Sequence, residues 1–127
     1  MRIPGHDGCF VCGKDSEIGL DFQPYDGRVC SRFRPSEKFQ SFEGIIHGGV
    51  LASVLAEAMG MAVALKVPKF LGRKVEVEYH APVRPGKTYE VCGEVLQVDG
   101  RKIFAVAHLH DDGGNLCATA RGLFIAV

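Results

Sequence analysis

One segment of this chain is far more apolar than the rest. Residues 44–65 read GIIHGGVLASVLAEAMGMAVAL and repeat their large apolar side chains every three or four positions. That spacing predicts one long helix. Lys66 suits the negative end of a helix dipole, and Pro68 cannot continue a helix, so we expect the helix to close at Pro68.

The segments on both sides carry the shorter patterns of strands. Before the helix, residues 20–22 and 28–33 are candidate strands, joined by a turn that contains the Asp26-Gly27 pair. Residues 35–43 are polar and predict a loop. After the helix, tight turns separate the last three of four candidate strands, so we expect these three to form an antiparallel meander. These later strands are expected at residues 74–79, 88–98, 102–110 and 116–127.

This element order predicts the α+β class. We expect one domain over residues 1–127, with residues 1–17 as an irregular lead-in, because 127 residues leave little room for two domains. The helix is near the length of a membrane span, but Gly, Ala and Glu57 dilute it. The flanking strands also need an apolar partner, which favours a buried central helix.

Composition narrows the class of protein. Apolar residues make up 46% of the chain, enough for a real core, and 15 basic residues balance 15 acidic ones, which argues against a broad nucleic-acid surface. Five cysteines without dense spacing do not indicate a disulfide framework. The first residues lack the apolar stretch of a signal peptide, so we expect a cytoplasmic protein.

Glu57 is the first candidate for chemistry. Between Ile45 and Leu65 it is the only acidic or basic residue apart from His47. An isolated carboxylate is costly to bury. Glu57 therefore either points to water or lies in a cleft with a function, and the sequence leaves both readings open.

The second candidate is the helix start, His47-Gly48-Gly49. The first N–H groups of a helix have no partner inside it, and together with the helix dipole they can stabilise an oxyanion. Two glycines let a substrate carbonyl approach the backbone. The alternative is a turn that binds nothing.

From Gly44 to Gly60 the chain resembles the hotdog-fold acyl-CoA thioesterases of the phenylacetate-pathway and hydroxybenzoyl-CoA type. The matching motifs are GIIHGGVLA running into LAEAMG, supported by VEYHAPV at 77–83 and CFVCG at 9–13. The resemblance covers most of the chain. It implies an antiparallel sheet of about five to six strands wrapped around one long central helix.

The resemblance also implies how such a site works. Sheets of two subunits pair, as a homodimer or a dimer of dimers (a homotetramer), and the active sites lie between subunits. The Gly48 N–H would polarise the thioester carbonyl, Glu57 would act as nucleophile or as base for water, and His47 would shape the helix start. Acyl-CoA would be bound, without a cofactor, by Gly49, Gln40, Ser41, Arg84 and Lys87.

This chain departs from the family at two positions. Relatives carry the catalytic carboxylate nine residues after the His, where this chain has Ala56, so Glu57 stands one position later. The polar residue often found on the strand after the helix falls on Gly72. We therefore carry two hypotheses: an acyl-CoA thioesterase that yields a carboxylic acid and free coenzyme A, and a non-catalytic acyl-CoA-binding protein. A hotdog hydratase ranks below both, because the Asp and His pair is missing.

The lead-in contains a weaker motif. His6, Cys9 and Cys12 have the spacing H-x2-C-x2-C, which could begin a metal site. A closed zinc site needs four ligands, and no second CxxC follows. We therefore expect an ordinary cysteine pair and no metal.

Overall fold

A single long helix forms the centre of the molecule. The structure, a computed structural model, describes residues 1–127 and places helix α1 at Gly48–Ala64. His47 caps its start by accepting a hydrogen bond at Nδ1 from the Gly49 N–H, 2.8 Å away. The predicted helix is confirmed, although it begins four residues after Gly44, because the Ile46 N–H donates to the Val83 carbonyl and that of Ile45 to the Phe42 carbonyl instead. None of the helices combines the length and apolarity needed to cross a membrane.

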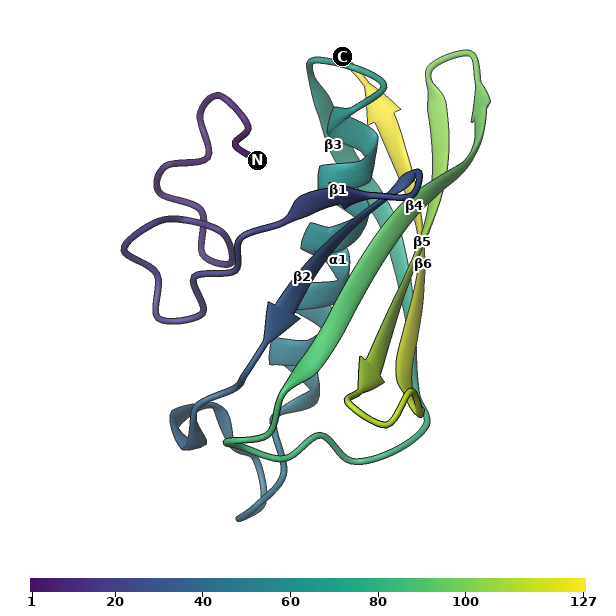
Figure 1. The fold of residues 1–127 in the computed structure, drawn as a ribbon. Helices are drawn as coiled ribbons and strands as arrows, with labels where there is room; N and C mark the ends of the chain where they lie inside the picture. The colour runs from purple at the N-terminus through teal and green to yellow at the C-terminus, as the bar shows by residue number, and fades with distance from the viewer.

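Six antiparallel strands form one sheet around this helix (Figure 1). The order across the sheet is β1-β2-β4-β5-β6-β3, so the predicted meander of the last three strands is confirmed. A short 3-10 helix, η1 (Glu37–Phe39), lies in the predicted loop. The strands are β1 (Gln23–Tyr25), β2 (Arg28–Phe33), β3 (Phe70–Tyr79), β4 (Tyr89–Asp99), β5 (Lys102–Asp111) and β6 (Leu116–Ala126).

The first predicted strand was placed wrongly. Strand β1 is Gln23–Tyr25 rather than residues 20–22, because the tight turn at Asp26 and Gly27 pairs Tyr25 directly with Arg28. Both turn residues have positive φ, as a two-residue hairpin loop requires. Leu20 and Phe22 instead pack into the core just before the strand.

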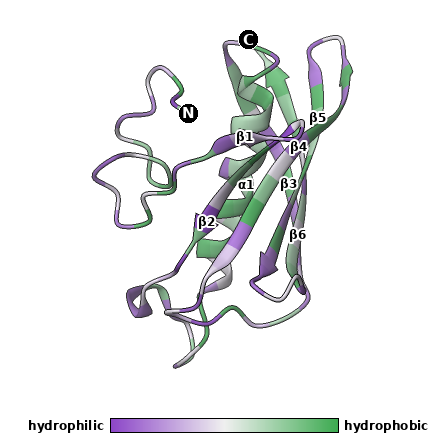
Figure 2. Cartoon of the chain, viewed as in Figure 1, coloured by the Kyte–Doolittle hydropathy of each residue, from purple (hydrophilic) through white to green (hydrophobic).

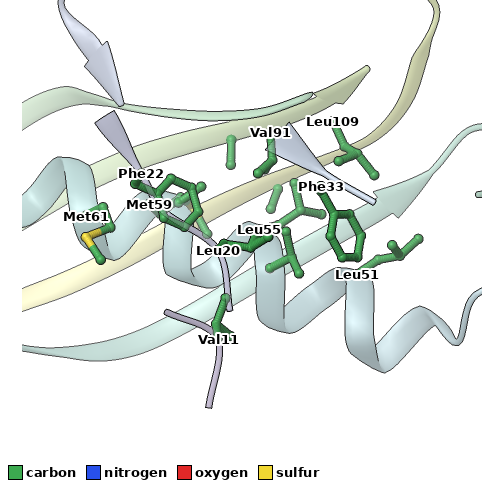
Figure 3. Close-up of a cluster of buried hydrophobic side chains, with 14 of the residues drawn as sticks. Val11, Leu20, Phe22, Phe33, Leu51, Leu55, Met59, Met61, Val91 and Leu109 are labelled. Carbon is green, nitrogen blue, oxygen red and sulfur yellow. The ribbon is translucent and has the colours of Figure 1, made fainter. Parts of the chain in front are cut away.

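The molecule has three layers: the sheet, the helix, and the irregular lead-in. Figure 1 shows the lead-in on one side of α1, with β4, β5 and β6 on the other. Apolar residues dominate α1 along its length (Figure 2). In Figure 3, Val11 of the lead-in and Leu20, just after it, lie against the helix near Leu55 and Met59. The lead-in thus contributes to the hydrophobic core.

The cysteine expectation needs one correction. Cys30 and Cys92 form a disulfide, with their sulfurs joined between β2 and β4. They stand directly opposite each other in the register of the two strands, an arrangement that spacing along the chain does not reveal. Because disulfides are commoner in oxidising compartments, the cytoplasmic location stays a prediction.

Candidate functional site

The start of α1 presents a free backbone donor. The N–H of Gly48 has no hydrogen-bond partner within the chain, whereas the Gly49 N–H is taken by the His47 imidazole. Gly48 is half-buried at the positive end of the helix dipole. Of the two glycines, only Gly48, the expected donor, has a free N–H, and His47 acts as the cap of the helix.

An open hollow of about 360 Å³ lies beside this donor. Gly48 lines it together with Ser41, Tyr79 and His80, and the rest of its wall is apolar. Tyr79 ends β3, and His80 follows it on a segment tied to Cys117 by backbone hydrogen bonds. The hollow thus combines one backbone donor with hydroxyl and imidazole groups from a different part of the chain.

Tyr79 explains why residue 48 is a glycine. Its hydroxyl donates a hydrogen bond to the Gly48 carbonyl at 2.7 Å, and its ring lies against the glycine. A Cβ on residue 48 would approach the ring to 3.2 Å, closer than ordinary contact. The glycine lets the ring and the helix start meet while its N–H stays accessible.

The other predicted binding residues fall into two groups. Ser41 lines the hollow, and Arg84 lies nearby, where its guanidinium donates to the Gly44 carbonyl at 3.2 Å. Gln40 is engaged instead, because its side-chain oxygen accepts from the Gly44 N–H at 2.6 Å. Lys87 is exposed and forms no ion pair. The structure therefore gathers Ser41 and Arg84 around the helix start.

Glu57 lies in a different environment. Its side chain is only 14% exposed, so it does not extend into bulk solvent. The Cys9 thiol donates to Glu57 Oε2 at 3.2 Å, and His6 Nδ1 lies 3.4 Å from the same oxygen. Cys12 completes the group, with its sulfur 3.5 Å from His6 Nδ1. The lone carboxylate of the helix is thus covered by the lead-in.

Helix geometry separates Glu57 from Gly48 of the same chain. Nine residues at about 100° each turn it roughly 180° round the axis, and the rise carries it about 13–14 Å along the helix. Ala56, in the slot where relatives carry the acid, is turned only about 80° from Gly48. Within one chain, the structure does not bring together the carboxylate and the oxyanion donor that the sequence paired.

The Cys12 thiol of this group has a shifted pKa, and burial is the main cause. Burial raises the pKa of Cys12, and hydrogen bonds to Glu57 and Cys9 raise that pKa further. The Cys12 thiol therefore stays protonated at neutral pH unless a cation or base joins the group.

Sequence reasoning missed two features of these sites. Tyr79 and His80 lie in the VEYHAPV motif, but sequence reasoning assigned neither of them a role in the site, since a polar residue at a strand end is common. The contact between Glu57 and the H-x2-C-x2-C motif had two separate signals in the sequence. The motif lacked a fourth metal ligand, and Glu57 lacked a partner for its charge. Only the fold shows that residues 6–12 reach residue 57.

Known proteins were then compared with this chain. A family model described as the thioesterase superfamily matches residues 43–118. An uncharacterized protein of Schizosaccharomyces pombe is 29% identical over 99 residues, which cover 73% of this chain and 57% of that protein. An acyl-coenzyme A thioesterase of Xenopus laevis is 24% identical over 115 residues, 89% of this chain and 51% of that protein.

Solved structures agree with the fold. A crystal structure described as thioesterase superfamily protein RHA08564 superposes with a TM-score of 0.83 at 26% identity, covering 89% of this chain and 60% of that one. The expected hotdog fold, a sheet wrapped around one helix, is confirmed. The chain spans only about half to three fifths of the length of these three proteins.

Proposed function

This chain belongs to the thioesterase superfamily, and we propose on that premise that it hydrolyses acyl-CoA thioesters to a carboxylic acid and free coenzyme A. One observation carries the proposal. Gly48 lines a hollow that is open to a ligand, and its N–H, at the start of the long helix, has no partner within the chain. The name of the Xenopus laevis relative supports acyl-CoA as the substrate class.

The helix start suits the developing charge of this reaction. When water attacks a thioester carbonyl, negative charge builds on the carbonyl oxygen. A preorganised N–H and the positive end of the helix dipole stabilise that charge, and such a donor contributes about 10²–10³ in rate. Arg84, on the rim of the helix start, is placed to meet a phosphate of coenzyme A.

We assign the activation of water to His80 rather than to Glu57. His80 lines the same hollow as Gly48, and one ring nitrogen lies 3.2 Å from the Thr119 hydroxyl, which fixes the ring. Imidazole is the commonest general base in enzymes. Glu57, the base that the sequence suggested, is turned to the other side of the helix and covered by the lead-in.

The proposed active unit is a dimer formed through β3. This strand is an edge of the sheet and is exposed along nearly all of its length. Leu71 is 65% exposed there, and Val75 and Tyr79 are exposed as well. A long edge with apolar residues is a template for pairing with another strand. Because Tyr79 also lines the hollow, pairing at β3 would place a second copy beside the site.

A second candidate function is non-catalytic binding of acyl-CoA. The observation in its favour is that no carboxylate lines the hollow, since Ala56 occupies the usual acid position and Glu57 is covered. This candidate keeps the Gly48 donor and the Arg84 contact and lacks turnover.

A hydrolysis screen with short, long and aromatic acyl-CoAs separates the two candidates. The wild-type protein is expected to release free coenzyme A from at least one class. The change His80→Gln should lower kcat by about 10²-fold, in the range for a general base, with little change in KM. Glu57→Gln should lower kcat far less.

The outcomes are distinct. Acyl-CoA binding without turnover in the wild-type protein would establish the second candidate. A loss of kcat in Glu57→Gln that matches or exceeds the loss in His80→Gln would return the base to Glu57. His110→Gln is the matched control, because His110 is a strand histidine away from the hollow.

A further inference from the structure

We propose that His6, Cys9, Cys12 and Glu57 form a tetrahedral site for a zinc-type transition metal that fastens the lead-in to the central helix. The inference does not depend on the proposed hydrolysis. It rests on the positions of four side chains that the chain brings together across 48 residues, from Cys9 to Glu57.

The spacing of the ligand atoms fits one metal ion. Zinc bonds of about 2.3 Å to sulfur and 2.0–2.1 Å to nitrogen or oxygen place tetrahedral ligands roughly 3.3–3.8 Å apart. The observed distances are 3.2 Å for Cys9 Sγ and Glu57 Oε2, 3.4 Å for His6 Nδ1 and Glu57 Oε2, and 3.5 Å for Cys12 Sγ and His6 Nδ1. All four ligand atoms lie within 4.8 Å of one another.

The loop around Cys9 fixes the position of its sulfur. The backbone N–H groups of Val11 and Cys12 both donate to Cys9 Sγ, each 3.4 Å away. Together with the contact to Glu57 Oε2, these bonds hold the sulfur within the group of four ligand atoms. Gly13 closes this turn, and a Cβ there would overlap the Cys9 carbonyl and crowd the Asp7 carbonyl. The tight turn therefore follows from the sequence C-x2-C-G.

The chemistry of the four groups selects the ion. Two soft thiolates and an imidazole favour zinc over magnesium or calcium, which prefer oxygen ligands. The only basic group near the Glu57 carboxylate is His6, with no Lys or Arg in an ion pair. A divalent cation balances the negative charge that two thiolates and a carboxylate would otherwise bring together.

The proposed metal site also explains how the N-terminal segment is held against the helix without secondary structure of its own. Residues 1–22 contain no helix or strand, yet Val11, Leu20 and Phe22 are buried in the core. Long segments without secondary structure are uncommon in compact domains unless something holds them. A metal bound by three lead-in residues and one helix residue would supply that constraint, because metal binding energy adds to folding energy.

Metal content and a cobalt spectrum test the site in the full-length chain. Protein expressed with zinc should contain one zinc ion per chain by mass spectrometry. After replacement by Co²⁺, the wild-type spectrum should show sulfur-to-cobalt charge-transfer bands and the strong visible bands of tetrahedral cobalt. Cys9→Ser with Cys12→Ser, and separately Glu57→Gln, should weaken zinc binding more than about tenfold, since even outer-shell changes cost 10–100-fold.

Cys117→Ser is the matched control, because Cys117 is a free buried thiol on β6 outside the group. It should keep both the zinc and the cobalt bands. The inference is overturned by wild-type protein that binds no more zinc than the double cysteine variant, or by a cobalt spectrum without sulfur bands. It is equally overturned by a Cys9–Cys12 disulfide in freshly prepared zinc-treated protein. The wild-type spectrum decides the matter even where a variant does not fold.

Discussion

The start of helix α1 and its middle use polar groups in opposite ways. At the start, the Gly48 N–H lies open beside a hollow, and the groups around it come from the backbone and from strand ends. In the middle, Glu57 is nearly covered, and its contacts are side chains of the lead-in. The first region is open to a ligand from solution, and the second is already enclosed by the chain.

The contrast between these two regions shows that a carboxylate in an apolar helix can be there for either of two reasons, to act on a substrate or to bind a partner within the protein. A carboxylate there must be compensated, but a substrate is not the only possible partner. The proposed metal ion, with its three other ligands, would compensate the charge of the carboxylate equally well. We infer that catalysis and architecture are divided between two positions of this helix that lie on opposite sides of it.

The largest effect is expected from Gly48→Ala. A methyl group there would crowd the Tyr79 ring and the space in which a carbonyl oxygen approaches the N–H, so kcat/KM should fall on the order of a hundredfold. Metal content should be unchanged. Gly60→Ala on the same helix is the control, because its Cβ would make only ordinary contact with Phe70, at 3.7 Å. An equal loss in both variants would show that the helix start has no special role.

A smaller effect is expected from breaking the β3 edge. Leu71→Lys with Val75→Lys should convert the proposed dimer to a monomer in light scattering, since charged residues block edge pairing. Turnover should fall by about tenfold, in line with a loss of positioning at the shared site. Protection of the lead-in from proteases should persist, because β3 pairs only with β6 and not with the lead-in. Leu96→Lys, an exposed change on β4, is the control.

The smallest effect is expected at the turn between β5 and β6, whose residue Asp111 belongs to neither region and gives a baseline for an ordinary polar contact. The N–H groups of Asn115 and Gly113 and the Asn115 amide donate to Asp111 and lower its pKa. A lowered folded pKa stabilises the protein above the unfolded value of about 3.9, and this contribution is lost as pH falls through the folded pKa. Asp111→Ala should therefore lower Tm at neutral pH, and the difference from wild type should shrink in acid.

Asp112→Ala is the control for this turn, because the Asp112 side chain is exposed and makes no hydrogen bond or ion pair. A Tm difference for Asp111→Ala that is the same at both pH values would contradict the assigned cause.

Most of the fold could be predicted from the sequence because its signals are local. The apolar run of α1, the turn pairs at Asp26-Gly27 and Asp99-Gly100, and the alternating strands each identify an element without reference to the others. The misplaced first strand shows where local sequence signals fail. Leu20 and Phe22 are apolar because they fill the core, and no local pattern separates that role from a strand.

The candidate sites were less predictable because they depend on contacts between distant segments. His47, Gly48 and Ser41 could be identified near the helix start, since they lie close together along the chain. His80 joins them only through the packing of the segment after β3. The partner of Glu57 lies some fifty residues earlier, and neither half of that group is complete by itself.

The disulfide between Cys30 and Cys92 makes a closed covalent ring of the chain between β2 and β4. Helix α1 and strand β3 both belong to that ring. The two cysteines are 62 positions apart in the sequence, and for a loop of that length chain-entropy estimates give about 4 kcal/mol of stabilisation. A single nick in the exposed loop around Phe42 would leave both fragments linked, so the oxidised protein would survive a cut that divides the reduced one.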